Sequence, residues 1–130
     1  MNPKKEDGEP SLEPDKLICN VDELPFYTPP GHWGTQNVRL VEGNDTGAYE
    51  MILGNMAAEG GSERHVHDKN YQAMFILEGV AMVELGASPP KQCPAGSVIR
   101  IPPGLDHRIT AGGKHPLRLI VVFSPPLEPL

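Results

Sequence analysis

The chain has 130 residues, of which 38% are hydrophobic and 22% are charged, and its formal net charge is −6 at pH 7. A chain of this length suits one domain with one small core, and an acidic chain without a stripe of lysines and arginines excludes a nucleic-acid partner. The longest apolar runs, Met74 to Leu77 and Leu119 to Phe123, are far shorter than the roughly 20 residues that a membrane-spanning helix needs, so we expect no membrane partner either.

The first part of the chain is predicted to be irregular. Residues 1–16 are charged and contain prolines, so they bury too little apolar surface to offset the entropy of ordering, and we expect a disordered tail. This start lacks the apolar core of a secretory signal, which favours a cytoplasmic location, where Cys19 and Cys93 would stay as free thiols. Residues 17–130 are predicted to form a single domain. Its first part, residues 17–36, is expected to be an irregular arm with one short strand, because prolines and glycines interrupt it.

From residue 38 onward, short runs rich in β-branched and aromatic residues alternate with turn residues, which is typical of an antiparallel sandwich or barrel. The expected strands are Val38 to Glu42, Ala48 to Asn55, Arg64 to His67, Gln72 to Leu77, Val80 to Leu85, Ser97 to Ile101, His107 to Thr110 and Leu117 to Phe123. With 14 glycines and 15 prolines, the chain shows no window with the periodicity of an ordinary helix. The predicted fold class is therefore all-β, with an antiparallel β-barrel as its architecture.

Three of the five histidines indicate a metal site. His65 and His67 are two positions apart, so on a strand both imidazoles would point to the same face, with Cα atoms roughly 7 Å apart. A third histidine, His107, follows the tight bend that Pro102-Pro103-Gly104 demands. Imidazole ligands suit one divalent transition metal, namely Fe, Mn, Ni, Cu or Zn.

The two histidine segments resemble the two sequence motifs of the cupin superfamily, whose small members hold a divalent metal inside a single β-barrel. Residues 60–79 resemble the first motif and residues 96–107 the second, and the flanking strands 47–59 and 117–123 extend the resemblance over most of the chain. The positions that match the family pattern include Gly79, Gly96, Pro102, Gly104 and His107. The resemblance implies a double-stranded β-helix, a jelly-roll-like cupin barrel that comprises residues 17–130.

The sequence departs from the family pattern at three positions. Gly60 lies one residue closer to His65 than is usual, and Ala111 stands where the second motif usually ends in asparagine. The third departure is Gln72, which stands where the family has a glutamate ligand. The resemblance therefore implies a variant site in which His65, His67, Gln72 and His107 hold the metal.

The fourth ligand is the least determined part of this prediction. Gln72 either binds the metal through its amide or turns away, which would leave three histidines and water, and Tyr71 is the other residue that can be aligned to this position. With Gln72 as ligand, the ion has no anionic protein ligand and the site carries about two positive charges. Such a centre favours an anionic exogenous ligand such as an enolate, a carboxylate or hydroxide.

Four protein ligands leave one or two positions of the ion open, which is typical of a catalytic metal. The resemblance implies an enzyme, and the leading hypothesis is an oxygenase, similar to dioxygenases, that acts on a small anionic or enolisable molecule and uses O₂. The alternatives are a non-redox lyase, isomerase or cyclase, and a cupin that binds a small ligand without converting it. Because cupins commonly pair through sheet edges and N-terminal arms, a homodimer is also expected.

The remaining polar residues leave several alternatives open. His32 either lines the pocket or lies outside it, whereas His115, in a Gly-Gly-Lys turn, is expected to be exposed. Arg100 and Arg118 either face solvent or point into the barrel, where a guanidinium could bind a substrate carboxylate. Metal loss is expected below about pH 6.5, the ordinary pKa of histidine, because an imidazolium cannot bind a metal.

Overall fold

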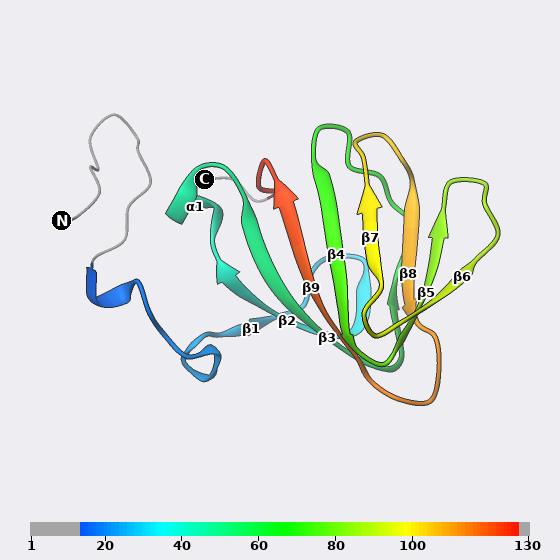
Figure 1. Ribbon diagram of the computed structural model, residues 1–130, viewed down its shortest axis with the longest axis horizontal. Helices are drawn as coiled ribbons and strands as arrows, with labels where there is room; N and C mark the ends of the chain where they lie inside the picture. Colours follow the sequence, from blue (N-terminus) through cyan, green and yellow to red (C-terminus); the bar gives the residue numbers. More distant parts are fainter. Residues whose placement is uncertain (1–13, 128–130) are drawn as a thin grey trace.

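The computed structural model describes residues 14–127 and consists of antiparallel strands that curl around a common interior (Figure 1). The strands are β1 (Phe26–Tyr27), β2 (His32–Val41), β3 (Glu50–Ser62), β4 (Tyr71–Glu78), β5 (Val80–Leu85), β6 (Lys91–Pro94), β7 (Val98–Ile101), β8 (His107–Ala111) and β9 (Leu117–Ser124). The helical elements are short, namely η2 (Pro14–Lys16), η3 (Val21–Glu23) and α1 (Gly43–Thr46). The prediction of an all-β antiparallel fold is confirmed.

The strand order is β6-β5-β8-β3-β9-β4-β7, with β2 added to β3 and β1 added to β2. The long strand β3 joins the two halves of this sheet. Its first half pairs with β9 from Glu50 to Met56, whereas its far end pairs with β8 through Gly61 and Thr110. The sheet therefore turns at β3, so that β8 and β5 face back toward β9 and β4 (Figure 1).

The interior is built by residues at alternate positions along the strands. In β9 the odd-numbered residues from Leu117 to Phe123 are buried, and in β4 the even-numbered residues from Gln72 to Ile76 are buried. The buried core contains Ile52, Met56, Met74, Ile76, Ala81, Val83, Cys93, Ile99, Ile101, Ile109, Leu117, Leu119, Val121 and Phe123. Since each large aliphatic or aromatic side chain contributes about 1.5–3 kcal/mol when buried, this interior holds the barrel together.

The register of the central strands brings two polar side chains into one row of the inner face. Phe123 pairs with Glu50 on one side and with Gln72 on the other. Antiparallel partners lie on the same face of a sheet, so Glu50, Phe123 and Gln72 all point inward. Two polar side chains, Glu50 and Gln72, therefore lie on the inner face with the ring of Phe123 between them.

Some strand boundaries differ from the prediction because glycines in this chain permit close packing rather than ending a strand. The strand β3 continues through Gly60 and Gly61 to Ser62, and β2 begins already at His32, in the segment expected to be irregular. A Cβ at Gly61 would lie 2.6 Å from Cγ2 of Thr110, and one at Gly60 would lie 2.7 Å from Cγ of Met56. Glycine is therefore required where β3 passes its neighbours.

Two further differences concern short segments. The predicted strand Arg64 to His67 is wrong, because its pairing is limited to an isolated bridge between His65 and His107. Conversely, β6 forms between the expected strands Val80 to Leu85 and Ser97 to Ile101, where no strand was predicted. It pairs with β5 at the end of the strand order, where Pro94 is tolerated because an edge strand leaves one side unpaired.

The N-terminal region is described only from residue 14, so residues 1–13 of the predicted tail lie outside the described residues. Within the arm, η3 is capped by Asn20 and β1 supplies the short strand that was expected. Cys19 is exposed and Cys93 is buried, and both are free thiols as predicted. No helix within residues 14–127 is long and apolar enough to span a membrane.

We expect Gly79→Ala to destabilise the barrel by about 2 kcal/mol or more. Gly79 joins β4 to β5 with a φ of +84°, and a Cβ there would overlap the carbonyl oxygen of Pro116. Denaturant unfolding monitored by circular dichroism measures the change. Gly113→Ala is the matched control, because a Cβ at Gly113 would meet no atom within 4 Å. Equal unfolding midpoints for the two variants would contradict this role of Gly79.

Candidate metal centre

His65, His67 and His107 come together because the loop after β3 is bound to the start of β8. The backbone N–H of His65 donates to the carbonyl of His107 at 3.0 Å, and the N–H of His107 donates back to the carbonyl of His65 at 2.9 Å. The N–H of Gly104 donates to the carbonyl of His67 at 2.9 Å. We call residues 63–70, between β3 and β4, the histidine loop. The bend at Pro102-Pro103-Gly104 thus leads into His107 and, through Gly104, also holds the histidine loop at His67.

The three imidazoles form a compact cluster. The ring centroid of His65 lies 4.8 Å from that of His67 and 4.4 Å from that of His107, and the remaining pair is 5.3 Å apart. One ring nitrogen from each histidine lies within 4.8 Å of the others. Since a metal–imidazole bond is about 2.0–2.1 Å long, three nitrogens at this separation can surround one ion after a small contraction.

Hydrogen bonds on the far side of two rings determine which nitrogen faces the centre. Nδ1 of His65 lies 2.7 Å from the carbonyl oxygen of Glu63, and Nδ1 of His107 lies 3.0 Å from that of Leu105. A carbonyl oxygen accepts but does not donate, so each Nδ1 carries the proton and each Nε2 keeps its lone pair. This is the arrangement in which metal-binding histidines are usually held.

The inward atoms fit a cation. Nε2 of His67, Nε2 of His107 and Oε1 of Gln72 are buried and have no hydrogen-bond partner among residues 14–127. Burying acceptors without a partner costs about 1–3 kcal/mol each. A divalent ion would satisfy all three at once, so the donor set present here suits a metal.

The strand β4 distinguishes between the two candidates for the fourth ligand. Gln72 is buried and lines the same cavity as His65 and His67, whereas Tyr71 lies on the other face and is 43% exposed. The amide nitrogen of Gln72 lies 3.4 Å from Sδ of Met74, whereas its amide oxygen has no hydrogen-bond partner within residues 14–127. The alternation along β4 therefore removes Tyr71 from the candidate ligands and keeps Gln72.

Burial favours the neutral form of two of the three imidazoles, those of His67 and His107. Desolvation, together with the charges of the neighbouring His65 and His107, lowers the pKa of His67 to about 4. Desolvation likewise lowers the pKa of His107, against the opposing effect of its hydrogen bond to Leu105. Neutral imidazole is the form that binds a metal, so the pocket maintains binding-competent ligands well below neutral pH.

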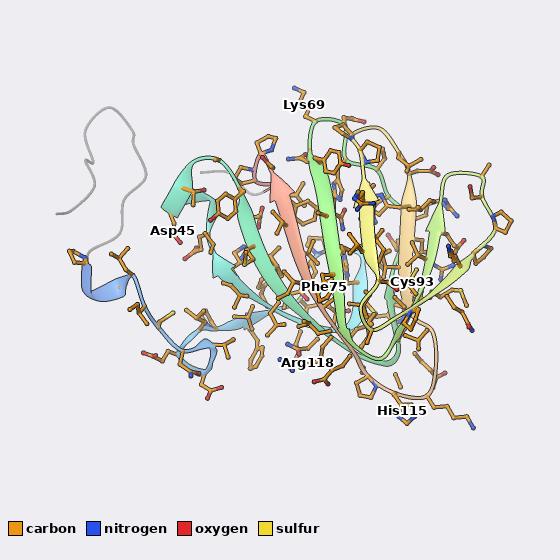
Figure 2. All side chains as sticks on the ribbon, viewed as in Figure 1. Asp45, Lys69, Phe75, Cys93, His115 and Arg118 are labelled. Carbon is orange, nitrogen blue, oxygen red and sulfur yellow. The ribbon has the colours of Figure 1, made fainter. Side chains whose placement is uncertain are left out.

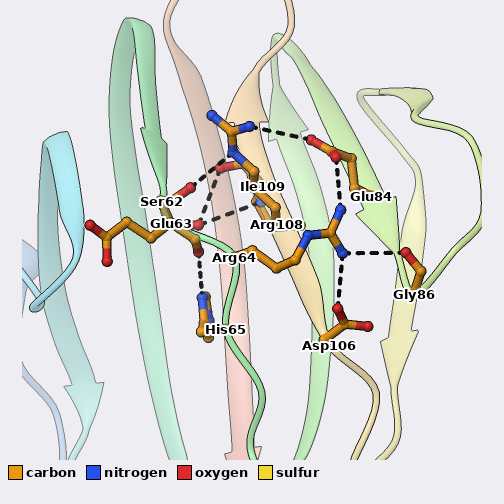
Figure 3. A network of polar contacts seen from close by, with 9 residues as sticks. All are labelled: Ser62, Glu63, Arg64, His65, Glu84, Gly86, Asp106, Arg108 and Ile109. Carbon is orange, nitrogen blue, oxygen red and sulfur yellow. Dashed lines mark hydrogen bonds and ion pairs between the residues drawn. The ribbon is translucent and has the colours of Figure 1, made fainter.

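A charged network on the outer side of the cluster supports the histidine loop (Figure 3). The guanidinium of Arg64 donates to Glu84 at 2.9 Å, to Asp106 at 3.2 Å and to the carbonyl of Gly86 at 3.3 Å. Arg108 donates to the carbonyl of Ser62 at 3.2 Å. Because Arg64 precedes His65 and Asp106 precedes His107, this network links the two segments that carry the imidazoles.

The cluster opens into a cavity of about 650 Å³ whose walls are mostly apolar. The polar residues that line this cavity include His32, for which the sequence did not decide between a place in the pocket and one outside it. The ring of His32 lies 6.1 Å from that of His65, and its buried Nδ1 has no hydrogen-bond partner in the described part of the chain. Burial and the adjacent His65 lower the pKa of His32 to about 4. His32 is thus a fourth imidazole beside the cluster, brought there by the pairing of β2 with Ser62 of β3.

The other charged candidates lie away from the cavity. Arg100 is exposed, and Arg118 lies on the outer face, where it donates to Asn55 at 3.1 Å and to Glu78 at 3.3 Å. His115 lies in the loop before β9 and is exposed, as expected (Figure 2). Neither Arg100 nor Arg118 is therefore placed to bind a substrate carboxylate in the interior.

Fold and site together define a small β-barrel protein with a candidate metal centre of three imidazoles and one amide at the end of an apolar cavity. The family model described as the cupin domain matches residues 53–123, which is more than half of the chain. The chain belongs to the cupin family.

Three individual proteins illustrate this relationship. The L-ectoine synthase of Bordetella parapertussis is 35% identical over 75 residues, which cover 52% of this chain and 52% of the synthase, so the chain spans about half the length of the curated relatives it matches. The polyketide cyclase RemF from Streptomyces resistomycificus superposes with a TM-score of 0.74 at 20% identity, covering 83% of this chain and 78% of RemF. An RmlC-like cupin from Shewanella frigidimarina gives a TM-score of 0.74 at 19% identity, covering 87% and 94%. At such identities the two solved structures support the fold alone.

We expect His107→Ala to lose nearly all bound metal while the barrel stays folded. The imidazole is removed from the centre, whereas the apolar interior that stabilises the sheet remains. Elemental analysis of the purified protein gives the metal content, and circular dichroism checks the fold. His115→Ala, which removes an exposed histidine outside the cluster, should keep the metal of the unaltered protein. An unchanged metal content in His107→Ala would contradict the assignment.

We expect the metal to be retained at about pH 5.5 and released as the pH falls to about 4 and below. The sequence alone placed this transition near pH 6.5, but burial lowers the pKa of His67 to about 4, so protons compete with the metal only in more acidic solution. Dialysis against a series of buffers followed by elemental analysis measures the transition. Release of the metal already at about pH 6 would show that protonation of these buried imidazoles does not control binding.

Proposed function

We propose that this protein is a metal-dependent enzyme of the lyase or cyclase type that acts on a small anionic or enolisable molecule without consuming O₂. The observation that carries this proposal is the set of neutral ligand atoms around one point of an apolar cavity: Nε2 of His67, Nε2 of His107 and Oε1 of Gln72 have no other partner in the described chain. His65 contributes the third imidazole.

Different residues bind the ion and orient its ligands. His65, His67, Gln72 and His107 hold the ion, which when bound supplies a Lewis acid that polarises a carbonyl or stabilises an enolate. The carbonyls of Glu63 and Leu105 fix the orientation of two of the rings. Because none of the four ligands is anionic, the centre favours a substrate that brings its own negative charge.

The cavity wall beside this centre is mostly apolar. Met74, Val121 and Phe123 are buried and line the cavity next to the ligands. Beside an apolar wall, the attraction between a cation and an anionic substrate is stronger than in bulk water. His32 lies beside the ligands and is neutral near pH 7, so its ring can accept a hydrogen bond from a bound substrate or donate one to it.

The names of the relatives support a non-redox reaction. One similar protein is an ectoine synthase and one superposable structure is a polyketide cyclase. Neither name refers to an oxygenase, which was the leading hypothesis from the sequence. The oxygenase would use the same ligands, and it stays a prediction that differs from the present proposal in one measurable respect, the consumption of O₂.

We expect the metal-loaded protein to convert its substrate equally well in the strict absence of O₂. A fractionated extract of small metabolites is incubated with the protein anaerobically and in air, and the products are followed by mass spectrometry. A product of the same mass as the substrate, or lighter by one molecule of water or another small neutral fragment, is the expected result. His107→Ala is the control, since its extract should stay unchanged. A product that gains oxygen atoms and forms in air alone would overturn the proposal in favour of the oxygenase.

A further inference from the structure

A second polar cluster lies in the same cavity, at the end formed by β1, β2 and β3. It consists of Asn37, Arg39 and Glu50, with Tyr27 beside them, and all four residues line the cavity. Asn37 pairs with Tyr27 across β1 and β2, and Arg39 pairs with Ile52 across β2 and β3. The four side chains therefore belong to the inner face of the barrel.

The charged pair in this cluster is unusual for an apolar interior. Glu50 is 1% exposed, and its Oε1 lies 3.7 Å from Nε of Arg39, while its Oε2 accepts a hydrogen bond from the backbone N–H of Leu127 at 2.6 Å. The guanidinium carbon of Arg39 lies 4.0 Å from the centre of the Tyr27 ring. Burying a carboxylate is costly unless it is paired, and the core would be equally well filled by an apolar side chain. A charged pair retained on the wall of a cavity is therefore a candidate binding group.

The separation between the two ends of the cavity follows from the register of the sheet. Glu50 and Gln72 are the two neighbours of Phe123, so their Cα atoms are two strand spacings, about 10 Å, apart. The ring of Phe123 lies between them and contacts His67, at 5.3 Å between ring centroids. A molecule only a few carbon atoms long can therefore reach from the metal ligands to Glu50 and Arg39.

We propose that Asn37, Arg39 and Glu50 bind the α-amino-acid head group of the substrate, while the opposite end of the same molecule, an anionic or enolisable group, is bound at the metal. Glu50 pairs with the ammonium group, Oδ1 of Asn37 accepts a hydrogen bond from it, and Arg39 binds the carboxylate. This inference rests on the proposed function, because it places the other end of the substrate at the histidine cluster.

The chemistry of the cluster favours a zwitterion over a simple ion. A carboxylate alone would be repelled by Glu50, and an ammonium group alone would be repelled by Arg39, whereas a zwitterion matches both charges. Oδ1 of Asn37 is buried without a hydrogen-bond partner among the described residues, so it can accept from an ammonium group. Arg39, whose side chain is 32% exposed, lies toward solvent, so the head group would enter last.

Binding of three related probes tests this assignment by calorimetry with zinc-loaded protein. L-glutamate carries the head group and a distal carboxylate, 4-aminobutanoate lacks the α-carboxylate, and glutarate lacks the α-ammonium group. We expect L-glutamate to bind at least about tenfold more tightly than either analogue, because each analogue lacks one of the two charged groups that Arg39 and Glu50 would contact and brings the other group without its compensating charge. Equal affinities for the three probes, or no binding of L-glutamate, would overturn the proposal.

Two variants assign the contacts individually. Arg39→Met should remove the preference for L-glutamate over 4-aminobutanoate, and Glu50→Gln, which keeps an acceptor for the N–H of Leu127, should remove the preference over glutarate. Arg118→Met, on the outer face, is the matched control and should bind as the unaltered protein does. Circular dichroism and metal content verify that each variant is folded and loaded, and preferences unchanged in both cluster variants would overturn the proposal.

The same probes distinguish this inference from the proposed function. In His107→Ala, without metal, L-glutamate should bind more weakly but still better than glutarate, because the head group is recognised away from the histidines. Loss of all preference in this variant would overturn the assignment of a separate head-group site. Oxygen-dependent turnover, in contrast, would overturn the proposed function and leave these binding preferences as they are.

Discussion

The reciprocal pair of backbone hydrogen bonds between His65 and His107 is the interaction on which the candidate centre depends. It connects a loop that follows β3 with the first residue of β8, which is 42 positions later in the chain. The short separation of the His65 and His107 imidazoles follows from it, and the network of Arg64 and Asp106 reinforces the same two segments. The carbonyls of Glu63 and Leu105 then fix the proton on Nδ1 of His65 and of His107, respectively.

The sequence was sufficient to predict the fold and to group the three histidines, because both are encoded locally. Alternating apolar residues and well-placed turns determine the strands, and the spacing of His65 and His67 gives the same side-chain direction in any extended segment, whether it is a strand or a loop with one bridge. For this reason the prediction of the histidine cluster survives although the predicted strand around it is wrong.

The phase of β4 could not be predicted for a physical reason. Phe75 and Leu77 are 44% and 38% exposed on the outer face, so both faces of this strand carry apolar residues and the usual contrast between them is absent. Gln72 and Tyr71 were therefore equivalent in the sequence. The position of His32 depends on the register between β2 and β3, and the proximity of Arg39 to Glu50 depends on the same pairing. Both contacts are formed between residues of different strands, so no short sequence motif predicts them.

The replacement of a carboxylate by Gln72 and the presence of Glu50 two strands away have a joint electrostatic consequence. An ion held by three imidazoles and an amide keeps its full positive charge, and Glu50, with a Cα about 10 Å from that of Gln72, is too distant to act as a ligand that replaces the missing carboxylate. With an ion bound, the cavity would have a strongly cationic end at the histidines and the paired carboxylate of Glu50 at the other end, with Phe123 between Glu50 and Gln72. In such a field a small molecule with one anionic end and one end that carries an ammonium group has a preferred direction, with the anion at the metal ligands. A glutamate at position 72 would neutralise part of that cationic end and weaken the preferred direction of such a molecule.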